Sequence, residues 1–276
     1  MNDEPRFDAY LPAEIAVRVR EVGVAKARLS SANVLALAVL AGAFIALGAM
    51  FSTMAISGVD TGFGLRRLLA GTTFSLGLVL VVVAGAELFT GNNLIAMAWA
   101  SRQITARDVL RNWSLVYLGN LIGSLGTALL FLWSGVWKMG GGVVGATALR
   151  IAEAKCELPF AEAFFRGVLC NTLVCLSVWL CFSARTTTDK IVLPITAFVA
   201  LGFEHSVANM YFIPLGILLQ HPAGGADLLS AGPGETFGWL DFAANLVPVT
   251  LGNIVGGTLL VGGVYWFVYL RGDRKA

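Results

Sequence analysis

An acid and a histidine adjoin in a stretch of the chain that is otherwise apolar. The stretch reads FEHSVANMYFIP and covers residues 203–214, with Glu204 and His205 near its start. A carboxylate beside an imidazole can exchange protons, and both groups are costly to bury without partners. His205 is also one of only two histidines in the chain. These residue types indicate the handling of protons or of a small ion, unless the histidine is only packed and hydrogen-bonded by its neighbours.

A similar polar interruption occurs in the first half of the chain, in AELFTGNN at residues 86–93. It aligns with FEHSVANM, which places Glu87 over Glu204 and Asn92 over Asn209. LGNLIG and LGNIVG, which lie farther along each half, align in the same order. The chain therefore carries two copies of one unit. The glycines four residues apart in the second pair of motifs would let helices pack closely.

The elements that hold these polar residues must lie in a membrane. The chain has 276 residues, of which 57% are hydrophobic and 13% are charged, and its mean hydropathy is +0.77. A helix needs about 20 residues to cross the hydrocarbon. Five charge-free runs are long enough or nearly so, and they cover residues 29–59, 68–86, 112–137, 167–184 and 242–270. A shorter sixth run is broken by Glu204 and His205 and then continues over residues 206–220.

We therefore predict an all-α membrane protein of six transmembrane helices, with the second and fifth helices broken at Glu87 and Glu204. Each copy contains three spans, so the second copy enters the membrane from the opposite side and the two form inverted repeats. Half-helices that start at a break point their N-terminal amides at the membrane centre, where they favour an anion. We expect function to centre on residues 86–93 and 203–210.

Three regions are expected along the chain. Residues 1–31 form an amphipathic helix on the cytoplasmic membrane surface, with basic residues facing the headgroups. Residues 32–270 form the transmembrane channel domain, whose repeats cover about 32–137 and 162–270, and residues 271–276 form a cytoplasmic tail.

The distribution of positive charge predicts the orientation. Counting lysine and arginine by alternate loops puts 13 on one side and 6 on the other. The side with the excess is expected to be cytoplasmic, which places both termini inside.

The remaining polar residues suggest supporting roles. A carboxylate beside an anion path would repel the anion, so we expect Glu87 and Glu204 to brace the broken loops by accepting hydrogen bonds from the loop backbone, with Asn209 as a further brace. Lys155 lies in an outer loop, where most lysines are merely solvated. The four cysteines lack the spacing of metal ligands and are interpreted as packing residues, so no metal and no cofactor is expected. Nucleotide-binding loops, hydrolase triads and nucleic-acid patches are not evident, and we do not expect an enzyme.

Four motifs resemble those of the formate/nitrite transporter family of bacterial channels: FEHSVANM, AELFTGN, LCNTLVCLSVW and NLVPVTLGNIVGG. The resemblance runs from about residue 8 to 271 and is closest to the formate branch. It implies an aquaporin-like protomer with its own pore, assembled as a homopentamer in the bacterial inner membrane. The family's central histidine falls on His205 and its acid on Glu204, and three further path residues fall on Thr90, Asn171 and Lys155.

The resemblance also implies the shape and cargo of the pore. Apolar constrictions around the histidine would come from Phe74, Leu78, Phe89, Val174 and Phe198. The implied function is proton-coupled transport of small monovalent weak-acid anions, foremost formate, each transiently protonated near His205. Nitrite, hydrosulfide or another short-chain acid is the alternative cargo within the family, and a neutral-solute pore of aquaporin type is the alternative outside it. The expected partners are the anion, membrane lipid and other copies of the chain, with no nucleic acid.

Overall fold

The computed structural model of the chain describes residues 9–198, 203–220 and 236–272. Within these ranges the regular elements are helices and no β-strand occurs, which confirms the predicted all-α class. The α-helices are α1 Pro12–Arg28, α2 Ser31–Ile56, α3 Phe63–Ala84, α4 Ala96–Ala100, α5 Ala106–Ser134, α6 Val143–Cys156, α7 Phe160–Ser183, α8 Thr187–Phe198, α9 Ser206–Gln220, α10 Trp239–Val255 and α11 Val264–Tyr269. Short 3₁₀ segments are η1 Gly91–Ile95 and η2 Val136–Lys138, and η4 Gly256–Gly263 is a π-helical stretch between α10 and α11.

Five of the described helices are long and apolar enough to cross a membrane. They are α2, α3, α5, α7 and the continuous helix of residues 239–269 that comprises α10, η4 and α11. α9 is shorter and equally apolar, and it lies between α5 and α6 in the packing of the bundle. The described chain is thus a bundle of apolar helices whose polar groups must find partners inside the protein.

The second and fifth spans are interrupted at the predicted positions. α3 ends at Gly85, whose φ of 80° lies in the left-handed region that glycine adopts at helix ends. The chain then runs without α-helix until η1 begins at Gly91. In the other half α8 ends at Phe198 and α9 begins at Ser206, and residues 199–202 lie outside the described ranges.

The two glycine motifs bring helix backbones into contact, one in each half. α5 packs on α2, and a Cβ at Gly123 would lie 2.0 Å from the carbonyl oxygen of Val39. α10 and η4 pack on α7, and a Cβ at Gly256 would lie 2.2 Å from the carbonyl oxygen of Val168. Only glycine fits at either position, so the sequence repeat is also a repeat of packing.

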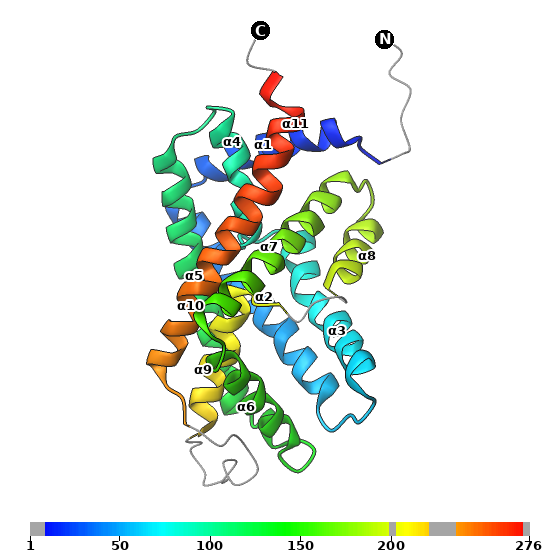
Figure 1. Ribbon diagram of the computed structural model, residues 1–276, viewed down its shortest axis with the longest axis vertical. Helices are drawn as coiled ribbons and strands as arrows, with labels where there is room; N and C mark the ends of the chain where they lie inside the picture. The colour runs from blue at the N-terminus through cyan, green and yellow to red at the C-terminus, as the bar shows by residue number, and fades with distance from the viewer. Residues whose placement is uncertain (1–8, 199–202, 221–235, 273–276) are drawn as a thin grey trace.

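The bundle has two distinct ends (Figure 1). α1 lies across one end, beside α11, and α6 lies at the opposite end. We call these the α1 end and the α6 end. The apolar face of α1, which includes Ile15, Val19 and Gly23, is buried against η1, α4 and α7. α1 therefore packs on the protein itself and partly covers the first broken loop.

Candidate functional site

His205 stands at the start of α9 and is fixed through both ring nitrogens. Its Nδ1 accepts a hydrogen bond from the backbone N–H of Ala208 at 3.1 Å, so the ring caps the helix. Its Nε2 lies 2.9 Å from the hydroxyl oxygen of Thr90 in the first broken loop. His205 is 4% exposed and Thr90 is fully buried. The two broken loops thus meet at this pair.

The hydrogen bonds assign the tautomer of the ring. An amide N–H only donates, so Nδ1 of His205 carries no proton, and the neutral ring holds its proton on Nε2. Nε2–H then donates to Thr90 Oγ1. The hydroxyl proton of Thr90 is left for another acceptor. The pair can therefore offer a hydrogen-bond donor at the centre of the protein.

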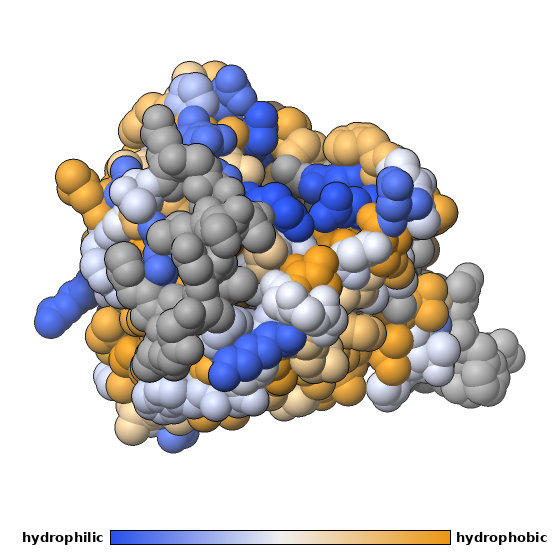
Figure 2. Space-filling model, turned by 90° about the horizontal axis from the view of Figure 1, so that it is seen from below, coloured by the Kyte–Doolittle hydropathy of each residue, from blue (hydrophilic) through white to orange (hydrophobic). Residues whose placement is uncertain are grey.

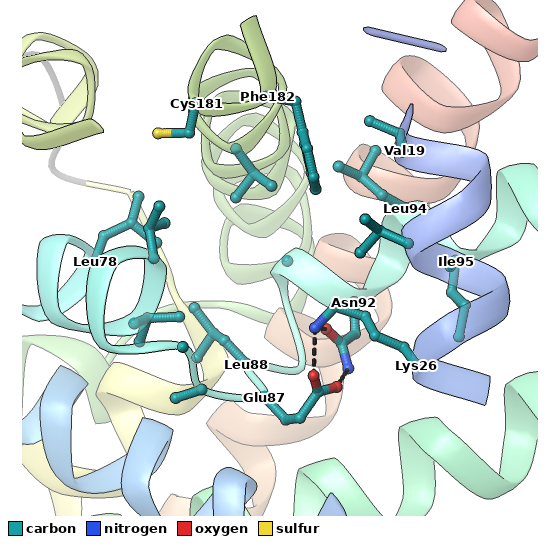
Figure 3. A pocket seen from close by; sticks show the side chains of 18 of the residues that line it. Val19, Lys26, Leu78, Glu87, Leu88, Asn92, Leu94, Ile95, Cys181 and Phe182 are labelled. Carbon is teal, nitrogen blue, oxygen red and sulfur yellow. Dashed lines mark hydrogen bonds and ion pairs between the residues drawn. The ribbon is translucent and has the colours of Figure 1, made fainter. Parts of the chain in front are cut away.

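Two cavities approach the pair from opposite ends. The α1-side cavity has a volume of about 410 Å³ and is lined by residues that include Val19, Lys26, Leu78, Glu87, Asn92 and Phe182 (Figure 3). The α6-side cavity has a volume of about 290 Å³, and His205 is part of its lining.

The barrier between these cavities is thin. Leu78 lines the α1-side cavity and Phe74 lines the α6-side cavity, and both belong to α3. Four residues of helix span about 6 Å. Leu78 is fully buried, and Phe89 and Val174 are only 3% and 1% exposed. An apolar layer about one helical turn thick therefore divides the two cavities.

A lysine of α1 fastens the first broken loop. Lys26 Nζ lies 2.5 Å from Glu87 Oε1 and donates to Asn92 Oδ1 at 3.0 Å. Asn92 Nδ2 donates to Glu87 Oε2 at 2.6 Å and to Asn112 Oδ1 at 3.0 Å. Figure 3 shows Lys26, Glu87 and Asn92 converging at the edge of the α1-side cavity. We expected the basic residues of α1 to face headgroups, and Lys26 points instead into the protein.

The second broken loop carries the same arrangement. Lys155 Nζ, at the end of α6, donates to Glu204 Oε1 at 3.0 Å. Asn209 Nδ2 donates to Glu204 Oε2 at 2.6 Å and to Asn245 Oδ1 at 2.7 Å. Each loop is thus held by one lysine, one glutamate and two asparagines. We call these the first and second lysine clusters.

The loop backbones are satisfied by a different pair of asparagines. Asn120 Nδ2 donates to the carbonyls of Ala38 and Glu87, and its Oδ1 accepts from Phe89 N–H. Asn253 does the same for Gly167, Glu204 and Ser206. We expected the loop carboxylates to accept these backbone hydrogen bonds. Among the described residues the carboxylates bond to side chains instead. The asparagine amides serve the backbone because they can donate to C=O groups and accept from N–H groups together.

The other predicted path residues lie around this centre. Asn171 of α7 is fully buried, and its Nδ2 donates to the carbonyl of Asn253 at 2.6 Å and to Asn93 Oδ1 at 3.3 Å. Among the hydrogen bonds of the described residues, none joins Asn171 to His205. Phe89 packs edge-on against Tyr117 with ring centroids 4.9 Å apart. Phe198 ends α8, and its side chain lies outside the described part of the structure.

The cysteines take no part in a ligand cluster. Cys170, Cys175 and Cys181 are buried and Cys156 is half-buried, and all four are free thiols. In the described ranges no group of three or more His, Cys, Asp or Glu side chains is placed to hold a metal ion.

Five residues of the site were not singled out from the sequence: Lys26, Asn112, Asn120, Asn245 and Asn253. Two of them, Asn120 and Asn253, stand between the repeated glycines of LGNLIG and LGNIVG. An amide in an apolar span at matching repeat positions is the signal that identifies them. Lys26 had no such signal, because a lysine near the end of an amphipathic helix is typical of a solvated face.

Comparisons with known proteins agree on one family. The sequence profile described as formate/nitrite transporter matches residues 13–267. The formate channel FocA of Escherichia coli (strain K12) is 44% identical over 98% of this chain and 98% of its own length. The formate channel FocA of Haemophilus influenzae is 41% identical over 80% and 81% of the two chains. A solved structure described as a pentameric formate channel with formate bound superposes with a TM-score of 0.80 at 39% identity, covering 87% of this chain and 98% of that one.

Proposed function

Because the chain belongs to the formate/nitrite transporter family, we propose that it conducts formate across a membrane through the two cavities that meet at Thr90 and His205. The observation that carries this proposal is the contact between these two side chains, because His205 lines the α6-side cavity and Gly91, next to Thr90, lines the α1-side cavity. The naming of its relatives as formate channels, and the bound formate of the similar pentamer, support the choice of anion.

The apolar layer favours passage of the neutral acid. A bare carboxylate loses several kcal/mol of solvation in a dry constriction, even after relaxation. Protonating an acid with a pKa near 4 at pH 7 costs about 4 kcal/mol, at about 1.4 kcal/mol per pH unit. The two costs are comparable. A hydrogen-bond donor at the entrance to the apolar layer favours passage of the neutral acid, because it holds the anion where it can gain a proton.

The residues act in a defined order. Cations at the cavity mouths and the positive end of the α9 dipole draw formate towards the centre. Thr90, whose hydroxyl proton is not taken by His205, donates to the carboxylate. The anion gains a proton that originates in water, crosses the layer formed by Leu78, Phe74 and Phe89 as formic acid, and releases the proton in the opposite cavity.

Supporting roles go to the two lysine clusters. Each pairs a buried carboxylate with a lysine, so the net charge beside the path is small and formate is not repelled. Asn171, through its bonds to Asn253 of α10 and Asn93 of η1, links α7 to both of these segments. The clusters hold the loops, and Thr90 and His205 meet the substrate.

Membership of the family supports a proposal for the oligomeric state and the membrane location of the protein. We place the protein in the bacterial inner membrane as a homopentamer with a pore in each protomer, as the similar pentameric structure suggests. α1 and α11 lie at the same end of the bundle, which supports termini on one side (Figure 1). We assign that side to the cytoplasm from the excess of lysine and arginine. Chemical crosslinking of the membrane-bound protein tests the pentamer, and protease digestion of sealed vesicles tests the orientation.

Reconstitution with a panel of solutes tests the proposed function. Proteoliposomes are given formate, nitrite, hydrosulfide, water or glycerol in stopped-flow experiments at two pH values. Formate flux that rises as the pH falls, with co-movement of protons, is the expected result. Equal or faster flux of nitrite or hydrosulfide would reassign the cargo within the family. Passage of water and glycerol without formate would show a neutral-solute pore instead.

A further inference from the structure

Arg67 is a cation of the α6-side cavity to which we assigned no role from the sequence. Its side chain lines this cavity together with Phe74 and Lys155. Arg67, Phe74 and Leu78 are seven and four residues apart on α3, so they follow one face of the helix. The spacing from Arg67 to Phe74 corresponds to about 10 Å along the helix axis, away from Leu78. Arg67 therefore lies at the outer part of the cavity, on the face that continues to the apolar layer.

Lys155 is ion-paired with Glu204, whereas Arg67 forms no ion pair among the described residues. The ammonium group of Lys155 lies 3.0 Å from Glu204 Oε1, and the side chains of the two are 14% and 5% exposed. Removing Lys155 from that pair would leave a buried carboxylate alone. Arg67 is exposed, and its guanidinium carbon lies 6.0 Å from the centroid of the Phe63 ring. It also interacts electrostatically with Glu204 and Arg166, but it forms no ion pair among the described residues. Its five N–H donors are therefore available to a ligand.

Arg166 of α7 brings a second guanidinium to the same cavity. It interacts electrostatically with Arg67, and the two charges repel each other. Arg166 is paired with Glu162 at 2.8 Å, one helical turn away, but both side chains of this pair are well exposed, at 43% and 55%. Exposed pairs of this kind are weak and exchange readily. Arg166 can thus turn from Glu162 to an anion in the cavity.

We propose that Arg67 and Arg166 form an anion-binding site at the outer part of the α6-side cavity, which takes a carboxylate or another small oxyanion. Two like charges that line one cavity are stabilised by an anion between them. The planar fork of a guanidinium matches the two oxygens of a carboxylate. A dianion such as sulfate is held there but does not proceed, because one proton does not neutralise it.

The surface agrees with this placement. Figure 2 shows the α6 end of the molecule, where a band of hydrophilic side chains lies in a recess between hydrophobic surfaces. An anion entering the α6-side cavity from this end meets Arg67 in its outer part before it reaches the half-buried Lys155 and the buried Glu204. The site deepens the proposed function and rests on it for its role in transport, although binding itself does not require that the anion crosses.

Formate kinetics on three variants test the role in transport. Arg67→Gln is expected to raise KM for formate uptake roughly fivefold at low salt, with little change in the maximal rate. Arg67→Lys keeps the charge and is expected to recover part of the loss. Arg66→Gln is the matched control, because Arg66 has the same charge, is the adjacent residue and does not line the cavity. Equal KM shifts in Arg67→Gln and Arg66→Gln, or no shift in either, would overturn the proposal.

Sulfate binding tests the site without any transport. The thermal unfolding midpoint of the purified protein is measured in sulfate and in chloride at equal ionic strength, since a ligand of the folded state raises that midpoint. We expect a larger sulfate-specific rise in the parent and in Arg66→Gln than in Arg67→Gln or Arg166→Gln. A rise that is the same in all four proteins would overturn the site. Failure of the parent to conduct formate would instead overturn the proposed function, and the sulfate measurement would still decide the site.

Discussion

Thr90 and His205 are 115 residues apart in the chain, and their side chains meet at 2.9 Å inside the protein. One belongs to the loop that interrupts the second span and the other to the loop that interrupts the fifth. The contact therefore joins the two halves of the repeat, and His205 brings it to the lining of the α6-side cavity.

Loss of the Thr90 hydroxyl should impair transport more than folding. Thr90→Val keeps the shape but leaves His205 Nε2–H without a partner and removes the donor offered to the anion. A hydrogen bond to a charged group contributes about 1.5–3 kcal/mol, so formate flux in proteoliposomes should fall roughly 10- to 100-fold. Thr90→Ser retains the hydroxyl and should keep most of the flux. Equal flux in the valine and serine variants would contradict this role.

Two substitutions of His205 distinguish the effects of its two hydrogen bonds. His205→Leu removes both the cap of α9 and the donor to Thr90, and formate flux should fall at least tenfold by the same reasoning. Asparagine caps helices well, so His205→Asn should keep α9 in place and retain a larger share of the flux. Stopped-flow formate uptake by both variants measures this. A leucine variant that transports like the parent would remove His205 from the mechanism.

The lysine of α1 and the carboxylate of the first loop should be energetically coupled. Lys26→Met alone leaves Glu87 buried without its cation, which costs about 3–5 kcal/mol of stability. Glu87→Gln in the same chain removes that charge, so the double variant should be more stable than the sum of the single changes predicts. Denaturant unfolding of all four proteins gives the coupling energy. Additive losses would show that the pair is not formed.

Asn253 should be essential to the second broken loop. Asn253→Leu leaves the carbonyl of Glu204 and the N–H of Ser206 unpaired, and each buried unpaired group costs about 1–3 kcal/mol. The thermal midpoint of the purified protein should fall well below that of the parent. Asn33→Leu is a suitable control, since Asn33 is exposed at the start of α2. Equal midpoints in the two variants would refute the bracing role.

The close contact of α5 with α2 predicts opposite effects at two glycines of one helix. Gly123→Ala would place a methyl group 2.0 Å from the carbonyl of Val39, so the helices must separate and stability should fall by about 1–3 kcal/mol. Gly126 has no atom within 4 Å of an added Cβ, and Gly126→Ala should be neutral or stabilise the helix by up to about 1 kcal/mol. Thermal unfolding of both variants in detergent checks the difference.

The repeat made much of this arrangement predictable. The alignment of AELFTGNN with FEHSVANM located both interruptions, and it paired Glu87 with Glu204 and Asn92 with Asn209, as the two lysine clusters do. The length of the charge-free apolar runs was enough to predict the membrane-spanning helices, because a bilayer permits few other ways to satisfy the hydrogen-bonding groups of a backbone.

What escaped prediction depends on contacts distant in sequence. Asn120 and Asn253 each bond to three backbone groups in two separate segments, and no local pattern shows which amide will be shared in that way. Lys26 reaches Glu87, 61 residues later, only because α1 folds back over the first loop. The partners of the two loop carboxylates were missed for the same reason, because each carboxylate bonds to a lysine from outside its own loop.

The bond from Ala208 to His205 Nδ1 limits what the ring can do. Rotation of the imidazole would remove the cap of α9 and leave the Ala208 N–H without its hydrogen-bond acceptor. The orientation of the ring is thus fixed. We infer that any gating of the pore comes from movement of the aromatic and aliphatic side chains around the ring.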